Sequence, residues 1–170
     1  IFLMIIETYS YPRAALIGNP SDGYFGKTIA FVFSNFCAKI QLYHTPELEI
    51  IPERMDVDKF ATIKDLAHRV SLNGYYGGLR LIKASIKVFY QHCQDCHIKL
   101  DDRNFTIRYS SNIPLRLGLA GSSAIITACF KALMAFYGVS IPKPIMANLV
   151  LSVENKELGI AAGLQDRVAQ

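Results

Sequence analysis

The sequence lacks a long hydrophobic run, a cluster of basic residues and a cysteine framework, and each absence argues against a class of protein. The terminal apolar stretch 1–6 is far shorter than a membrane span and lacks the flanks of a secretory signal, so we expect a cytoplasmic protein with no membrane partner. The net charge is only +4 and the basic residues are dispersed, which argues against a nucleic-acid partner. There is no repeat, low-complexity tract or linker.

The cysteines have no disulfide-framework spacing and sit among apolar residues, which is typical of reduced thiols. Cys93 to His97 reads C-Q-D-C-H, formally a haem-attachment pentapeptide, and His92 extends it to a metal-like H-C-x-x-C-H. A haem or zinc module is therefore one alternative. We expect a structural role instead, because the two cysteines continue the apolar stripe of a predicted helix and no second ligand pair follows.

The chain does have enough apolar residues to build a core. Its 170 residues are 51% hydrophobic, which suits one domain over residues 1–170. Alternating and β-rich segments predict strands near 14–17, 28–33, 37–44, 47–51 and 105–109. Apolar residues at helical spacing predict helices over 58–72, 78–97, 124–136, 145–156 and 166–170. Strands followed by helices, then a strand and more helices, indicate an α+β fold.

A glycine-rich turn at residues 113–124 reads I-P-L-R-L-G-L-A-G-S-S-A and leads into the apolar helix. Gly118 and Gly121 let the backbone approach an anion closely, and the amides at the start of a helix point toward it. Ser122 or Ser123 can cap the helix and offer a hydroxyl to phosphate or Mg²⁺. This turn predicts a nucleotide phosphate site, with a plain capped helix as the alternative.

Three stretches in chain order resemble the motifs of the GHMP kinases, the family of galactokinase, homoserine kinase, mevalonate kinase and phosphomevalonate kinase. Residues 12–26 read P-R-A-A-L-I-G-N-P-S-D-G-Y-F-G and resemble the first motif, and residues 114–124 resemble the phosphate-binding second motif. Residues 154–170, E-N-K-E-L-G-I-A-A-G-L-Q-D-R-V-A-Q, are similar to the segment that carries the family's catalytic aspartate. The resemblance implies the N-terminal half of the GHMP fold, related to the second domain of ribosomal protein S5, without the C-terminal half.

The resemblance also implies roles for single residues. Asp166 would activate or orient the acceptor hydroxyl and Arg13 would stabilise charge beside it, although each could instead be an ordinary surface residue. Ser123 and Glu154 would hold Mg²⁺, with Glu157 as the competing glutamate. The phosphates of ATP would lie on Pro114, Gly118, Leu119, Ala120, Gly121, Ser122, Ser123 and Ala124.

The predicted acceptor site narrows the resemblance. Asp22 falls where the family's sugar kinases place an aspartate on substrate hydroxyls, but the usual G-E-H-x-D reads G-N-P-S-D here. With N-G-Y-Y-G-G-L-R at residues 73–80, this variant looks most like the glucuronokinases. Tyr75 and Tyr76 can meet a sugar, and Arg80 can bind a carboxylate through two parallel hydrogen bonds. Aromatic packing at a helix start, with Arg80 in solvent, is the alternative.

We therefore expect an ATP- and Mg²⁺-dependent sugar kinase that converts D-glucuronate to glucuronate 1-phosphate, and we expect residues 1–170 alone to have little or no turnover. Another GHMP acceptor, such as galactose, a heptose or mevalonate, is the second possibility. A truncated, non-catalytic nucleotide-binding remnant is the alternative from another class. The near match to a Walker A loop at residues 21–28, S-D-G-Y-F-G-K-T, leads into a predicted strand and not a helix, so we set it aside.

Overall fold

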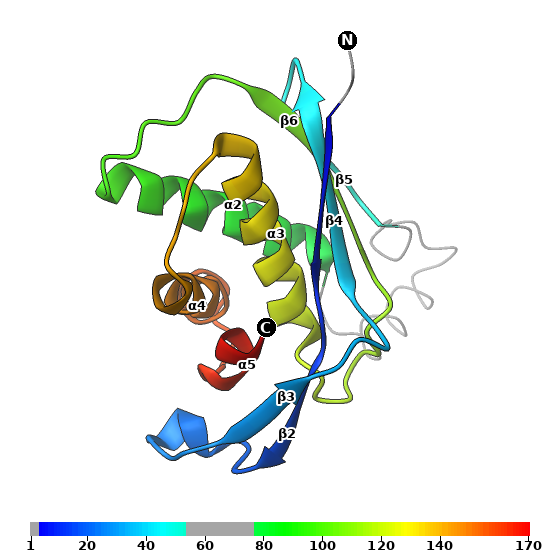
Figure 1. Cartoon of the computed structure of the whole chain (residues 1–170), viewed down its shortest axis with the longest axis vertical. Coiled ribbons are helices and arrows are strands. Elements are labelled where there is room, and N and C mark those ends of the chain that lie inside the picture. Colours follow the sequence, from blue (N-terminus) through cyan, green and yellow to red (C-terminus); the bar gives the residue numbers. More distant parts are fainter. Residues whose placement is uncertain (1–3, 54–76) are drawn as a thin grey trace, which may run out of the picture.

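A computed structural model of the chain describes residues 4–53 and 77–170. These residues form a β-sheet with helices packed on one face (Figure 1). The strands of the sheet lie in the order β1 (Ile5–Ser10), β4 (Ala38–Thr45), β6 (Asn104–Ser111) and β5 (Glu49–Ile51). β1, β4 and β6 pair antiparallel, whereas β5 runs parallel to β6. The predicted α+β fold is confirmed; the helix predicted over 58–72 lies outside the described residues.

Alternating side chains along β4 turn one face of the sheet toward the helices. Ile40 and Leu42 are fully buried, while Gln41 between them is only partly covered on the other face. In the antiparallel register with β6, Ile40 lies opposite Tyr109 and Leu42 opposite Ile107, and these two partners are buried as well. Cross-strand apolar pairs of this kind hold the register, because a shift by one residue would expose the whole row.

β1 is a strand that the sequence pattern did not reveal. It pairs with β4 along its full length, from Ile5 opposite Tyr43 to Ser10 opposite Ala38. Thr8 also donates a side-chain hydrogen bond to the carbonyl of Ala128 in the central helix, at 2.6 Å. The strand is thus stabilised by its long-range partners. The mixed polarity of this short segment does not predict a strand by itself.

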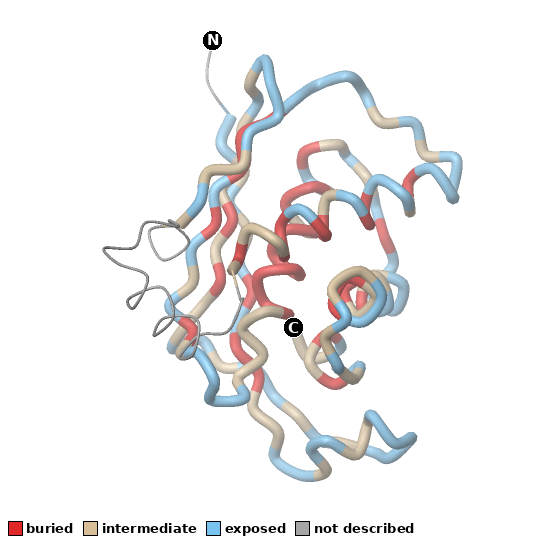
Figure 2. Tube along the Cα trace, turned by 180° about the vertical axis from the view of Figure 1, so that it is seen from behind, coloured by how far each residue is buried: buried red, intermediate tan, exposed pale blue. Residues whose placement is uncertain are grey.

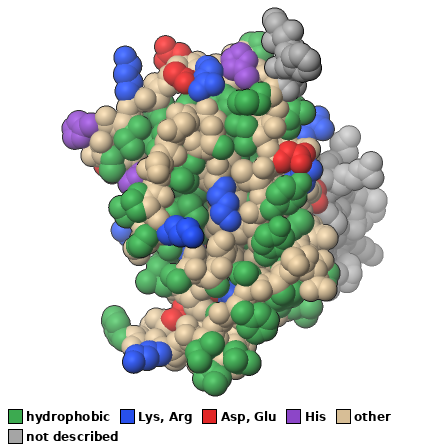
Figure 3. Space-filling model, in the orientation of Figure 1, with side chains coloured by type: hydrophobic (Ala, Val, Ile, Leu, Met, Phe, Trp, Pro, Cys, Tyr) green, Lys and Arg blue, Asp and Glu red, His purple; other side chains and the backbone are tan. Residues whose placement is uncertain are grey.

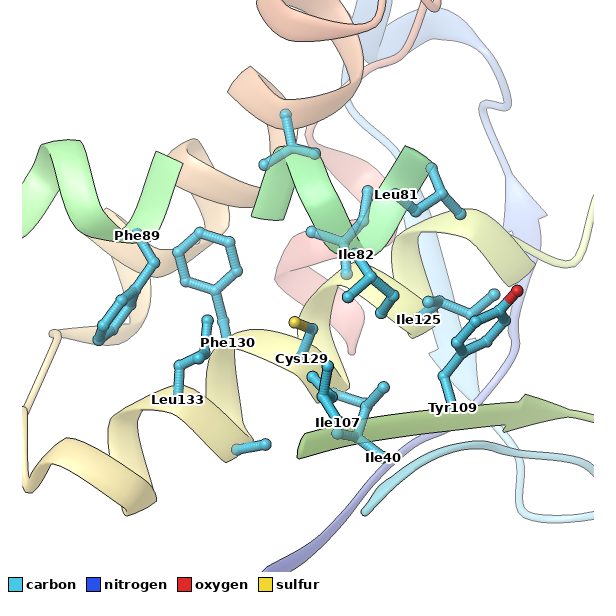
Figure 4. Close-up of a cluster of buried hydrophobic side chains, with 14 of the residues drawn as sticks. Ile40, Leu81, Ile82, Phe89, Ile107, Tyr109, Ile125, Cys129, Phe130 and Leu133 are labelled. Carbon is cyan, nitrogen blue, oxygen red and sulfur yellow. The ribbon is translucent and has the colours of Figure 1, made fainter. Parts of the chain in front are cut away.

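The central helix of the fold is α3 (Gly121–Tyr137), which is buried on nearly all sides. Figure 2 shows buried residues concentrated along this helix and on the strands beside it. The other helices are α2 (Gly78–Asp95), α4 (Lys143–Ser152) and the short α5 (Gln165–Ala169). Phe89 of α2 meets Phe130 of α3 edge to face, with ring centroids 6.1 Å apart, inside the cluster drawn in Figure 4. This aromatic pair joins the two helices.

Helical spacing predicts a buried stripe on α2 made of Leu79, Ile82, Ile86, Phe89 and Cys93, and the buried face of the helix differs from it. Leu79 and Ile86 are only partly buried, whereas Leu81 and Val88, outside the stripe, lie in the core. The reason is that α2 contacts not only α3 but also α4 and the π-helical turn η3 (Val153–Glu157). A helix covered from several directions buries a wider arc than one 3.6-residue stripe predicts.

A second, two-stranded sheet extends from the body of the molecule. β2 (Arg13–Ile17) and β3 (Ile29–Val32) form an antiparallel hairpin, with a 3-10 turn η1 (Ser21–Tyr24) between them (Figure 1). Figure 3 shows apolar side chains on this lower end of the molecule. The hairpin exposes the large apolar residues Leu16, Ile17, Tyr24, Phe25, Ile29, Phe31 and Val32. The hairpin therefore contributes little to the core.

The four cysteines and the lengths of the helices bear on predictions made from the sequence. All four cysteines are free, and burial raises the pKa of the Cys129 thiol to about 12. Cys96 lies 3.7 Å from the Nδ1 atom of His92. Within 4–53 and 77–170, no three His, Cys, Asp or Glu side chains come together as a metal site, and no helix is long and apolar enough to cross a bilayer.

We predict that Phe130→Ala lowers the free energy of unfolding by about 3–5 kcal/mol, because the ring is fully buried and its loss leaves a cavity between α2 and α3. The matched control is Phe25→Ala, which removes a fully exposed ring and should cost less than about 0.5 kcal/mol. Urea unfolding of the two variants measures both values. Equal losses would mean that the packing around Phe130 is not as described.

Candidate active site

The glycine-rich turn ends at the uncapped start of α3. Gly118 and Ala120 both have positive φ angles, 68° and 57°, and this left-handed backbone at Ala120 starts the helix at Gly121. No side chain caps the helix, and its first turn contains no acidic residue. The prediction that Ser122 or Ser123 caps α3 is wrong, because the early start places both serines inside the first turn. The first turn of α3 therefore supplies no acidic side chain to the positive end of the helix dipole, which suits a phosphate site.

Ser123 is the second feature of this helix end. The residue is 1% exposed, and its hydroxyl finds no hydrogen-bond partner among the described residues. A buried hydroxyl without a partner costs free energy, so such groups are rare and need an explanation. A phosphate oxygen or a Mg²⁺ ion would provide the missing partner, so the residues fit the predicted role.

Arg13, at the start of β2, joins the glycine-rich turn to the predicted catalytic aspartate. Its backbone N–H donates to the carbonyl of Leu119 at 3.1 Å. Its guanidinium, largely buried, donates through Nη2 to Oδ1 of Asp166 on α5. The N-terminal hairpin, the turn and the C-terminal helix therefore meet at one arginine, and Asp166 lies beside the predicted phosphate site.

Asp166 is partly buried and lies among charged groups of both signs. Burial raises the pKa of its carboxyl above the ordinary value, and the nearby Arg13 cation opposes the rise while the Asp22 carboxylate adds to it. Its second oxygen, Oδ2, accepts a hydrogen bond from Nη1 of Arg167 at 3.2 Å. A raised pKa makes the ionised carboxylate a stronger proton acceptor, and the arginines keep the ionised form accessible.

The π-helical turn η3 carries Glu154 into the protein interior. Its carboxylate forms an ion pair with Arg167, and both side chains are buried. Burial lowers the pKa of Arg167 to about 10, an effect strengthened by the nearby Arg13 cation. Glu157, the competing glutamate, instead pairs with Lys87 of α2 at 2.7 Å. The structure thus brings Glu154, and not Glu157, next to the residues of α5. This position favours Glu154 as the predicted metal ligand.

Asp22 fixes the beginning of α5 from the tip of the hairpin. Its Oδ2 accepts the backbone N–H of Gln165 at 2.9 Å, and Gly163 passes so close to it that a β-carbon there would collide with the carboxylate. The side chain of Gln165 donates to Asn19 Oδ1 at 3.3 Å. Residues of the first motif therefore hold the element that carries Asp166.

Two further residues of this region were missed by sequence reasoning. Gln170 donates through Nε2 to the carbonyls of Tyr11 and Ala120, at 2.9 and 3.0 Å, and so links the end of α5 to the residue before the first motif and to the glycine-rich turn. Arg167 binds two predicted functional carboxylates. A sequence signal existed only for Arg167, as a charged residue directly beside the predicted catalytic aspartate; the amide of Gln170 gives none.

The sequence of this chain resembles those of known proteins. Residues 80–170 match the family model of the GHMP kinases N terminal domain. The chain belongs to the GHMP kinases. It is 47% identical over 169 residues to "Probable glucuronokinase 2" and 46% identical over 168 residues to "Glucuronokinase 1", both from Arabidopsis thaliana. These matches cover 98% and 97% of this chain but 46% of each relative, so the chain spans about half the length of the curated relatives it matches.

Solved GHMP kinase structures share the fold. A mevalonate kinase from Methanococcus jannaschii superposes with a TM-score of 0.68 at 27% identity, covering 98% of this chain and 50% of that one. A galactokinase from Lactococcus lactis complexed with galactose gives a TM-score of 0.74 at 17% identity, over 97% of this chain and 41% of that one. The second likeness concerns the fold alone.

Of the remaining predicted acceptor residues of this GHMP kinase chain, Tyr75 and Tyr76 lie outside the described residues. Arg80 is half-buried in the first turn of α2. Two open cavities of about 360 and 420 Å³ lie between the far ends of α2 and α3, where both are lined by Tyr90 and Tyr137. Neither cavity is lined by Arg13, Glu154, Asp166 or Arg167. The candidate site is therefore located by its charges and hydrogen bonds and not by a cavity.

We predict that Ser123→Ala does not lower the free energy of unfolding and raises it by about 3 kcal/mol at most. The change removes a buried hydroxyl that has no hydrogen-bond partner among the described residues. As a control, Thr8→Val removes a hydroxyl that does have a partner, the carbonyl of Ala128, and should cost about 0.5–1.5 kcal/mol. Chemical denaturation without nucleotide measures both. A loss of more than 1 kcal/mol for Ser123→Ala would show that the hydroxyl has a structural role.

Proposed function

We propose that the protein carrying this chain transfers the γ-phosphoryl group of ATP to the anomeric hydroxyl of D-glucuronate, giving glucuronate 1-phosphate. The observation that carries the proposal is the 46–47% identity with two glucuronokinases over nearly the whole chain. A homoserine kinase from Nitratiruptor matches a smaller part of the sequence, with 38% identity over 69 residues, or 41% of the chain. Because the chain spans about half of each glucuronokinase, the activity belongs to the whole protein.

ATP is proposed to lie with its phosphates at the start of α3. The amides at the start of α3, whose first turn has no acidic residue, suit a polyanion, as does the left-handed backbone at Gly118 and Ala120. Ser123 and Glu154 would hold Mg²⁺, which prefers one or two protein ligands plus phosphate oxygens. When bound, the ion would neutralise charge on the transferred phosphoryl group.

Asp166 is proposed to accept or orient the proton of the acceptor hydroxyl. The raised pKa of its carboxyl suits that task, and Arg13 fixes one of its oxygens while also being bound to the glycine-rich turn. Arg13 would further stabilise charge on the acceptor oxygen, since a guanidinium stays ionised. Most of the rate enhancement in phosphoryl transfer comes from such positioning and charge stabilisation.

The acceptor is proposed to meet Asp22 through its hydroxyls and Arg80 through its carboxylate, with Tyr75 and Tyr76 against the ring. Asp22 already lies next to Asp166, close enough to raise the pKa of that carboxyl. Arg80 offers the bidentate geometry that a sugar acid requires and a neutral sugar does not. This chemistry favours glucuronate over galactose.

We propose that residues 1–170 form one half of the kinase and that the β2–β3 hairpin packs against the other half. Exposed Leu16, Ile17 and Phe25 would be covered by such packing. The hairpin begins at Arg13, so a domain seated there would also close the acceptor side of the site. A non-catalytic remnant is the alternative, and it predicts no turnover of the full-length protein with any acceptor.

We predict that Asp166→Asn in the full-length protein lowers kcat with glucuronate about 100- to 10,000-fold, because the amide cannot take the proton. Affinity for ATP should stay within about twofold, since Asp166 is proposed to act on the acceptor and not on the nucleotide. The control is Asp101→Asn, which changes an exposed aspartate paired with Arg103.

The same assay tests the acceptor. The wild-type protein is given ATP and glucuronate, galactose, a heptose or mevalonate, and phosphate transfer is measured for each. Faster transfer to any acceptor other than glucuronate would refute the proposed substrate, and full kcat in Asp166→Asn would refute the proposed role of that carboxylate.

A further inference from the structure

Arg167 follows Asp166 in the chain, and its guanidinium lies between the two carboxylates that are proposed to act in the reaction. The side chain is 2% exposed. Nη2 pairs with Oε2 of Glu154, on the π-helical turn, and Nη1 donates to Oδ2 of Asp166 at 3.2 Å. Nη1 also donates to the carbonyl of Gly163. One planar group therefore contacts a carboxylate from each of two elements, η3 and α5.

The geometry uses what distinguishes arginine from lysine. A guanidinium presents several N–H donors in a rigid fork, whereas an ammonium is a single point charge on a flexible chain. Because Arg13 binds Oδ1 of Asp166 and Arg167 binds Oδ2, both oxygens of this carboxylate are held by arginines. The orientation of the Asp166 carboxylate is therefore fixed from two sides.

The charges around Arg167 explain why a cation is needed there. Glu154 is 5% exposed and Asp166 is 17% exposed, so both carboxylates are poorly hydrated. Asp22 adds a third negative charge nearby, and Arg13 is the other cation close to the cluster. Without Arg167, Glu154 would be left as a buried charge without its cation, and the carboxylates would repel one another.

We propose that Arg167 is a positioning residue that holds Glu154 and Asp166 at a fixed separation, so that the metal-binding carboxylate and the acceptor-activating carboxylate face the same γ-phosphoryl group. The inference rests on the proposed function, which assigns those two roles. In this proposal Arg167 acts through the two carboxylates and not by contact with the acceptor or the nucleotide. Partners that orient a metal-binding carboxylate in this way typically affect metal affinity and activity by about 10- to 100-fold.

The decisive variant is Arg167→Lys in the full-length protein, because it keeps the charge and removes the fork. We expect kcat with glucuronate to fall about 10- to 100-fold, and the affinity for Mn²⁺ in the presence of ADP, measured by electron paramagnetic resonance, to fall by a similar factor. The melting temperature should change by only a few degrees, since the buried charge remains neutralised. The matched control is Arg103→Lys, where the arginine pairs with exposed Asp101 far along the chain from the cluster, and neither quantity should change.

Wild-type kcat and wild-type Mn²⁺ affinity in Arg167→Lys would overturn the proposal, because a purely neutralising role needs only the charge. If Arg167→Lys does not fold, the double variant Glu154→Gln with Arg167→Met, which removes both charges of the buried pair, is compared with Glu154→Gln alone. We expect the double variant to have a kcat at least tenfold lower than the single variant, since Asp166 loses one of its two holders. Equal kcat values would overturn the proposal. A wild-type protein that is inactive with glucuronate would instead refute the proposed function, while the Mn²⁺ measurement still decides the role of Arg167.

Discussion

The ion pair between the buried Arg13 and the partly buried Asp166 is the interaction on which the candidate site depends. It connects residues at opposite ends of the chain, and it can form only if β2 starts beside the glycine-rich turn and α5 docks against the hairpin. Removing one partner of a fully buried pair typically costs about 3–5 kcal/mol, which is an upper bound here because Asp166 keeps 17% of its side-chain surface exposed. The ion pair therefore forms only when the motifs are in place. The packed core of α2, α3 and the sheet provides the free energy that keeps the motifs together.

The start of α3 shows how the fold gives up local stability at the place where phosphate is proposed to bind. A helix end is ordinarily satisfied by a capping side chain, which is worth about 1 kcal/mol, yet α3 has none. Arg116 and Ala120 adopt left-handed backbone angles that residues other than glycine avoid. Ser123 adds a buried hydroxyl without a partner among the described residues. Departures of this kind cluster at functional sites, because a bound ligand supplies the contacts that the protein omits.

Sequence reasoning succeeded where a signal is local and failed where it depends on distant partners. The alternation in β4 and the glycines before α3 are written into neighbouring residues, so the strand and the turn were predicted. β1 was missed because its partners on β4 stabilise it, and the buried arc of α2 was misjudged because α4 and η3 also cover it. Gln170 binds carbonyls of residues far along the chain, and Arg167 pairs with Glu154 on a separate element, so family resemblance could point to Asp166 but not to the side chains around it.

The position of Asp22 gives a physical reason for placing the proposed acceptor side of the site on a hairpin and not on the core. Its carboxylate binds the N–H of Gln165, the residue directly before Asp166, so polar contacts hold the tip of the hairpin against α5. Polar contacts of this kind depend on geometry more than apolar packing does, because a hydrogen bond weakens steeply when its angle departs from linearity. An acceptor hydroxyl bound by the same carboxylate would therefore be aligned with α5 by the contact that holds it. In the proposed site, binding of the sugar and placement of Asp166 therefore both depend on the orientation of the Asp22 carboxylate.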